Sequence, residues 1–173
     1  MSNQRQSSGG GSRSAAGDRS PWLIAIVVSI ATFMVVLDTA IANVSLRYIA
    51  GSLAISVDES TWVVTTYLIA NAVVLPISGW LSNVIGRKRF YMLCVAVFTV
   101  ASLACGAAPD LGTLIGARMV QGGAAALMVP ASLALIRQNY ADPGRRARAI
   151  AIWTAAGSVA VAIGPVVGGL LTS

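Results

Sequence analysis

Two charged residues stand alone inside long apolar stretches of this sequence, and they are the strongest candidates for chemistry. Asp38 lies in the apolar run 22–44, and Arg118 lies in the apolar run 111–136. A charge inside hydrocarbon costs about 3 kcal/mol or more, so such a residue is normally kept for a task or for a partner. A carboxylate and a guanidinium in this setting are therefore candidates for a function or for pairing with each other.

The two charges lie at matching depths. Asp38 is six residues from the end of its run, or about 9 Å along a helix, and Arg118 is seven residues from the start of its run, or about 10 Å. They can therefore meet or share one water-filled cavity. In the alternative, each side chain extends alone to the headgroups, for which Arg118 is long enough and Asp38 is too short.

Polar amides and small residues give further candidates. Asn43, Asn71 and Gln121 are amides at membrane depth, which either line a cavity or bond across helices. In the run 149–171, small residues recur at every fourth position: Ala156, Ala160, Gly164 and Gly168. This ridge allows two helix backbones to approach closely, either for a specific function or as ordinary tight packing.

The elements that position these residues are five apolar runs, at 22–44, 61–81, 90–108, 111–136 and 149–171. Each is near the roughly 20 residues with which a helix crosses about 30 Å of hydrocarbon, whereas barrel strands are half as long and alternate. Only 10% of the residues are charged, against roughly 25% in soluble domains. The sequence predicts an all-α transmembrane fold of about five spans, with the lipid bilayer as its solvent.

Several classes of function are disfavoured. The net charge is +6, but the bases form short clusters between apolar runs, which is typical of membrane topology and not of nucleic-acid binding. There is no histidine, which disfavours hydrolytic and zinc chemistry, so we expect no enzyme, no metal and no cofactor. Cys94 and Cys105 are about 16 Å apart on a helix, too far for a disulfide, and are interpreted as small apolar residues.

Residues 1–20 are polar and predict a disordered cytoplasmic tail before a membrane region at 21–173. The connections predict a capping box at Ser56–Glu59 and turns at Ala108–Asp110 and Asp142–Gly144. Ten bases fall on one side of the membrane: Arg5, Arg13, Arg19, Arg87, Lys88, Arg89, Arg137, Arg145, Arg146 and Arg148. Arg47 alone falls on the other, so the N-terminus is predicted to be cytoplasmic and Ser173 external.

The segment 79–89 resembles the loop signature of the major facilitator superfamily, which reads Gly, three residues, Asp-Arg, one residue, Gly-Arg-Arg/Lys. Four positions fit: Gly79, Gly86, Arg87 and Lys88. Asn83 and Val84 stand where the family usually has Asp and Arg, a charge pair that latches the cytoplasmic side. In the alternative, the basic cluster only sets topology.

Three further segments extend the resemblance. Residues 37–44 are similar to the first-span motif of the fourteen-helix drug:proton antiporters, the EmrB/QacA-like branch, with Arg47 where a proline is common. Arg118, Gln121 and Gly122 match the Arg-x-x-Gln-Gly motif, which is associated with proton transfer. The fifth run resembles the antiporter signature Gly-Pro-x-x-Gly-Gly, at Gly164, Pro165, Gly168 and Gly169.

This resemblance implies the N-terminal part of a major facilitator superfamily bundle, ending before a complete six-helix half. It implies proton-coupled efflux of drugs or other lipophilic compounds across the inner membrane. Asp38 would couple protons or attract cations, Arg118 would tune Asp38, and Asn43 and Gln121 would line the cavity. The implied partners are protons, a small lipophilic substrate, and the remainder of the transporter or a second copy.

Two alternatives stay open. One is a small non-transporting membrane protein that oligomerises through the ridge at 156–168, or an inactive truncated product. The other is a facilitator-type exporter of a metabolite. Substrate identity is not predicted, because specificity lies in side chains of both halves of such transporters.

Overall fold

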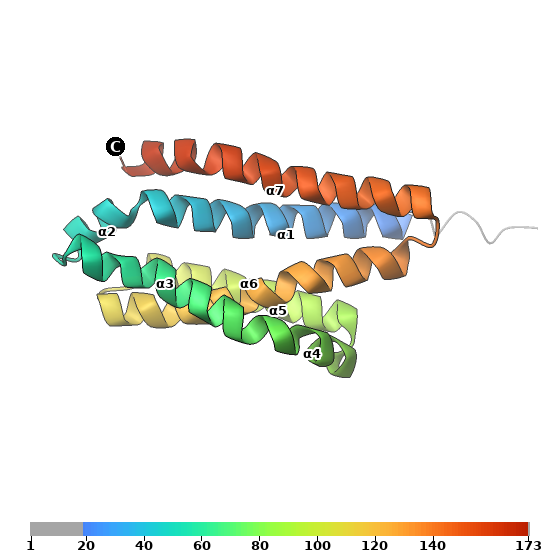
Figure 1. The fold of residues 1–173 in the computed structure, drawn as a ribbon, viewed down its shortest axis with the longest axis horizontal. Coiled ribbons are helices and arrows are strands. Elements are labelled where there is room, and N and C mark those ends of the chain that lie inside the picture. The colour runs from blue at the N-terminus through green and yellow to red at the C-terminus, as the bar shows by residue number, and fades with distance from the viewer. Residues whose placement is uncertain (1–18, 173) are drawn as a thin grey trace, which may run out of the picture.

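The computed structural model describes residues 19–172, and this part of the chain is a bundle of helices (Figure 1). Their bounds are α1 Arg19–Val44, α2 Leu46–Ser52, α3 Val57–Val74, η1 Leu75–Ile77, α4 Ser78–Ile85, α5 Arg87–Gly106, α6 Leu111–Asn139 and α7 Pro143–Thr172. Five helical stretches are long and apolar enough to cross a membrane: Trp22–Val44, Val57–Ile85, Arg87–Gly106, Leu111–Asn139 and Pro143–Leu170. The predicted all-α transmembrane fold is confirmed. The predicted tail lies outside the described residues, except for its last two, which begin α1.

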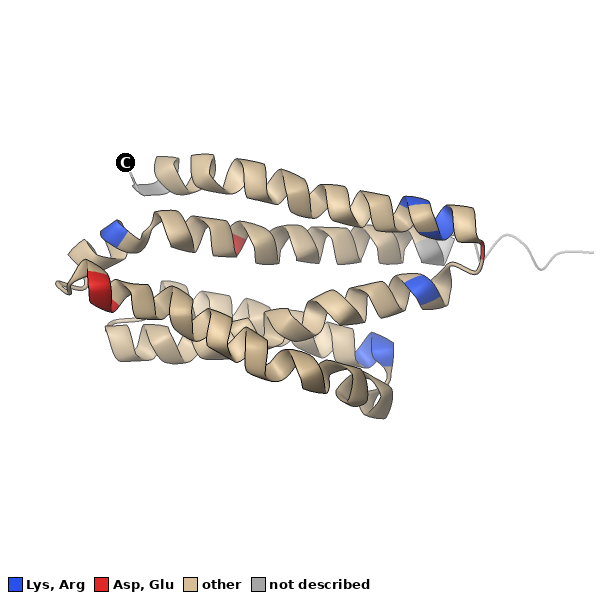
Figure 2. Cartoon of the chain, viewed as in Figure 1, with Lys and Arg blue, Asp and Glu red and all other residues tan. Residues whose placement is uncertain are grey.

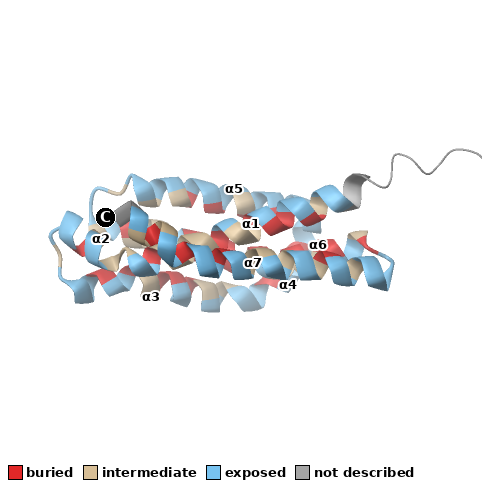
Figure 3. Ribbon diagram, turned by 90° about the horizontal axis from the view of Figure 1, so that it is seen from above, coloured by how far each residue is buried: buried red, intermediate tan, exposed pale blue. Residues whose placement is uncertain are grey.

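Helix α6 is the central element of the bundle. Helices α3 and α5 both pack along α6, while α1 packs mainly along α7 and also touches α6. Of the five spans, α6 is the most buried, and the spans formed by α3–α4 and by α7 are the least buried. Figure 3 shows buried positions facing inward and exposed positions covering the outside. The large apolar side chains on that outer surface suit a lipid environment.

Two helix starts follow from local capping. The Ser56 hydroxyl accepts a hydrogen bond from the Glu59 N–H at 3.1 Å, and the Glu59 carboxylate accepts one from the Ser56 N–H at 2.8 Å. The predicted capping box is therefore confirmed. Asp110 begins α6 in the same way, because its carboxylate accepts from the Thr113 N–H at 2.9 Å. That bond lowers the pKa of Asp110 below its usual value.

The boundaries differ from the predicted spans in several places. The second span runs from Val57 to Ile85 and passes through a 3-10 turn around Pro76, because proline cannot donate the α-helical bond. Helix α5 begins at Arg87, three residues before the predicted run. In place of the predicted turn at Asp142–Gly144, α7 begins at Pro143, directly after Asp142, because proline is favourable at the first helical position. Helix α2 was not predicted.

Candidate functional site: an ion pair between two spans

Asp38 on α1 and Arg118 on α6 form an ion pair inside the bundle. Arg118 Nη1 donates to Asp38 Oδ2 at 2.7 Å, across 80 residues of sequence. The Asp38 side chain is 19% exposed and the Arg118 side chain is 11% exposed. A charge-assisted hydrogen bond of this length is strong, and it is stronger away from water. The structure thus joins the two charges that the sequence singled out, and Arg118 does not extend alone to the headgroups.

Hydroxyl groups extend this polar cluster from α1 to α3. The hydroxyl of Thr39, the residue after Asp38, lies 3.0 Å from the carbonyl oxygen of Val35 and 3.3 Å from the hydroxyl of Tyr67. Tyr67 is buried, with 6% of its surface exposed. Sequence reasoning missed Tyr67, although a hydroxyl in the middle of an apolar span was a usable signal.

Gln121 lies one helical turn beyond Arg118 and is fully buried. Its Oε1 accepts a hydrogen bond from the Cys105 thiol of α5 at 3.4 Å, so Cys105 is a polar partner and not only the small apolar residue that was predicted. Within the described residues, Arg118 Nε and Gln121 Nε2 are buried N–H groups with no acceptor. Both lie on one face of α6, where they can donate to an oxygen of a water or a substrate.

Asn43 is placed apart from this cluster. Its amide is exposed near the end of α1 and donates to the Thr39 carbonyl oxygen of its own helix at 2.8 Å. In the described part of the chain, no hydrogen bond joins Asn43 to Asp38, Arg118 or Gln121.

The loop signature forms a corner between two helices. Gly79 and Asn83 lie on α4, and Arg87 and Lys88 form the first turn of α5. Gly86 joins the two helices with φ +89°, a conformation that residues with a side chain rarely adopt. No hydrogen bond or ion pair among the described residues links this corner to Asp38 or Arg118.

The antiporter signature lies where α7 packs against α1. A methyl group added at Gly164 would collide with the Ala40 side chain, and one added at Gly168 would lie 3.2 Å from Val44 Cβ. A methyl group added at Gly169 would meet no atom within 4 Å, and Pro165 lies inside α7. The ridge predicted at 156–168 therefore packs within this chain, so its Gly164–Gly168 face is already occupied by α1 and not available for a second copy.

Comparisons with known proteins show which family and which relatives this chain resembles. The family described as Major Facilitator Superfamily matches residues 28–173. The chain is 39% identical over 150 residues to the multidrug export protein EmrB of Escherichia coli (strain K12), covering 87% of this chain and 29% of that protein. It is 38% identical over 149 residues to the fatty acid resistance protein FarB of Neisseria gonorrhoeae, covering 86% and 29%, respectively.

A solved structure shows the same fold. It is a bacterial homologue of the human lysosomal transporter Spinster, in an inward-facing and unoccupied conformation. The superposition has a TM-score of 0.68 at 20% identity and covers 94% of this chain and 31% of that one. This chain spans about 29% of the length of its relatives EmrB and FarB. With the family matching most of its residues, the chain is a multi-pass membrane protein that belongs to the Major Facilitator Superfamily.

Proposed function

We propose that this chain is the first part of a proton-coupled exporter of lipophilic compounds in the inner membrane. The observation that carries the proposal is the 2.7 Å ion pair of Asp38 and Arg118 between two membrane spans. Ionisable pairs in such a position are characteristic of proton pathways. The names of the relatives, which refer to multidrug export and fatty acid resistance, support a lipophilic substrate. The remaining spans, protons and the substrate are the proposed partners.

The mechanism follows from the chemistry of the pair. A proton that binds Asp38 neutralises the carboxylate and weakens its bond to Arg118. Because Asp38 lies on α1 and Arg118 on α6, this proton changes the strength of the tie between two spans. A cationic substrate acts on the same equilibrium, since it competes with Arg118 for the carboxylate. The proton and a cationic substrate therefore compete for one carboxylate, so that binding of one disfavours binding of the other, which is the requirement for exchange.

The test is a fusion in which residues 28–173 replace the matching segment of Escherichia coli EmrB. Cells that carry the fusion should export a lipophilic dye in a proton-dependent manner. With Asp38→Asn in the same fusion, dye export should fall to the level of cells that express the 173-residue chain alone. Asp58→Asn is the matched control, because Asp58 is an exposed acid at the start of α3 and should leave export unchanged. A fusion that inserts at the parental level but exports no dye contradicts the proposal, as does full export by Asp38→Asn.

We further propose that the N-terminus is cytoplasmic. In this proposal, additional spans complete the six-helix half. The proposal is supported by the gathering of basic residues at one end of the bundle (Figure 2). Reporter fusions inserted after Ala141 should be active only as cytoplasmic reporters, and fusions after Pro109 or Ser173 only as external ones. A cytoplasmic signal at Ser173 contradicts this orientation.

A further inference from the structure

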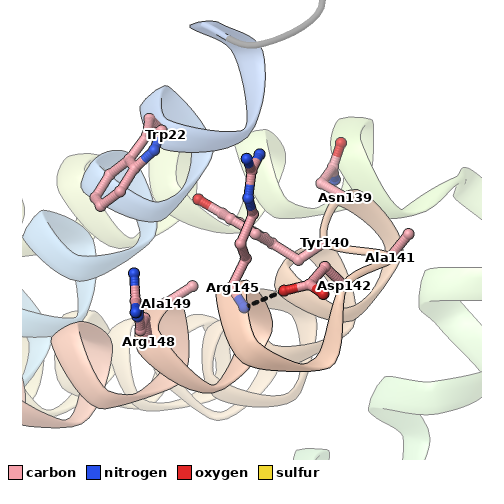
Figure 4. A pocket seen from close by; sticks show the side chains of 8 residues that line it. All are labelled: Trp22, Asn139, Tyr140, Ala141, Asp142, Arg145, Arg148 and Ala149. Atoms are coloured by element: carbon pink, nitrogen blue, oxygen red, sulfur yellow. Dashed lines mark hydrogen bonds between the residues drawn. The ribbon is translucent and has the colours of Figure 1, made fainter.

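A second polar site lies away from the ion pair, where one end of α1 meets the connection between α6 and α7. A cavity of about 480 Å³ opens there (Figure 4). Its polar and aromatic walls come from six residues: Trp22, Asn139, Tyr140, Asp142, Arg145 and Arg148. We call this cavity the basic pocket. None of these residues takes part in the Asp38–Arg118 cluster.

The basic pocket lies at the boundary between the apolar and the charged part of the bundle. Trp22 is the first residue of the first span, and Arg145 and Arg148 lie in the first two turns of α7. In Figure 4, the Trp22 indole and the guanidinium groups of both arginines surround the same opening. Tryptophan is enriched at this level of a membrane, where its ring lies between headgroups and chains.

The charge in the basic pocket favours an anion. Its walls carry two guanidinium groups and one carboxylate, that of Asp142. Asp142 is already engaged, because its Oδ2 accepts a hydrogen bond from the backbone N–H of Arg145 at 2.7 Å. Arg145 has other contacts within the protein, but a guanidinium has five N–H donors and can also serve a ligand. Guanidinium groups match phosphate geometry, so phosphate is the anion that this pair suits best.

We propose that the basic pocket binds the headgroup phosphate of an anionic phospholipid such as phosphatidylglycerol. Arg145 and Arg148 donate to the phosphate, and the Trp22 ring packs on the glycerol and the upper acyl chain. A membrane lipid fits better than a soluble phosphate, because the opening lies beside an indole that is 54% exposed at the start of a span. Basic pockets between membrane helices are known to hold such headgroups. Bound lipid would brace the start of α7 against α1 and α6.

The experiment measures lipid binding to the purified 173-residue chain in neutral detergent by native mass spectrometry. Phosphatidylglycerol is titrated against phosphatidylcholine, and the unmodified chain should retain the anionic lipid preferentially. Arg145→Gln/Arg148→Gln should weaken phosphatidylglycerol binding about tenfold or more, since two charge-assisted contacts are lost. Arg47→Gln/Arg137→Gln removes the same charge from exposed positions outside this pocket, and should change binding by no more than about twofold. Equal losses in both double variants would overturn the proposal, because general attraction would then explain the binding.

A neutral substitution gives a second, independent arm. Trp22→Ala should weaken phosphatidylglycerol binding at unchanged net charge, whereas Trp62→Ala on α3 should not. The two tryptophans are matched in exposure, at 54% and 56%. Displacement of the lipid by soluble glycerol phosphate would show that the pocket takes free phosphate, which contradicts the proposal. Because no arm depends on transport, these results stand apart from the test of the exporter.

Discussion

Asp38→Asn is expected to destabilise the chain by up to about 3 kcal/mol, the lower end of the usual cost of removing one partner of a buried ion pair, because Asp38 is only partly buried. The substitution keeps the size of the side chain but leaves the Arg118 charge, 11% exposed, without its carboxylate. Arg118 Nε already lacks an acceptor within the described residues, so the lost bond is not readily replaced. The measurement is the free energy of unfolding of the purified chain in mixed micelles, from a denaturant titration.

A double-mutant cycle isolates the pair. Arg118→Gln should also destabilise the chain, and Asp38→Asn/Arg118→Gln should cost less than the sum of the single changes, since no unpaired charge is left behind. Asp58→Asn, at an exposed acid, should have little effect. If the two losses of unfolding free energy are additive, Asp38 and Arg118 do not stabilise one another, and the ion pair does not couple α1 to α6.

Gly122→Ala is expected to destabilise the chain by about 1–3 kcal/mol, the usual cost of overpacking. A methyl group at this position would collide with the backbone oxygen of Tyr67 and lie 3.0 Å from the Tyr67 Cα. Backbone atoms cannot rotate away as a flexible side chain does, so α3 and α6 must separate. The displaced Tyr67 would also lose its 3.3 Å contact with Thr39. The same denaturant titration measures the loss.

The neighbouring glycine is the matched control for this change. A methyl group at Gly123 would lie 3.6 Å from Val74 Cγ2, an ordinary contact distance. Alanine also favours a helix over glycine by about 1 kcal/mol. Gly123→Ala should therefore leave the free energy of unfolding unchanged or raise it. Equal destabilisation by the two substitutions would contradict the close contact between α3 and α6.

Much of the fold was predictable because hydrocarbon imposes length and composition on each span. The five apolar runs and the Ser56–Glu59 capping box needed only local information, and the structure confirms both. The early start of α7 depended on whether Asp142 and Pro143 begin a helix or a turn, and the same residues favour either. Helix α2, at Leu46–Ser52, is too short to give a readable periodicity.

The candidate site was predictable in part. Asp38 and Arg118 were singled out as lone charges in apolar runs at matching depths, but whether they meet or only share a cavity depends on how α1 packs against α6. The contact of Cys105 with Gln121 also joins two helices, and no local pattern encodes it. The ridge at Gly164 and Gly168 was visible in the sequence, although only the packing of α7 on α1 identifies its partner. Pairings between helices thus account for most of what was missed.

The long separation of the ion pair has a consequence for biosynthesis. Asp38 precedes Arg118 by 80 residues, and a ribosome adds about 5–20 residues per second, so Asp38 is made about 4–16 s before its partner. Helix α7, the main neighbour of α1, emerges later still. During this interval the first span holds an unpaired acid in or near the lipid. If Asp38 is charged and lies inside the hydrocarbon, its insertion costs about 3 kcal/mol. Helix α1 therefore leaves the ribosome before both α6 and α7, and its packing is complete only after α7 has followed.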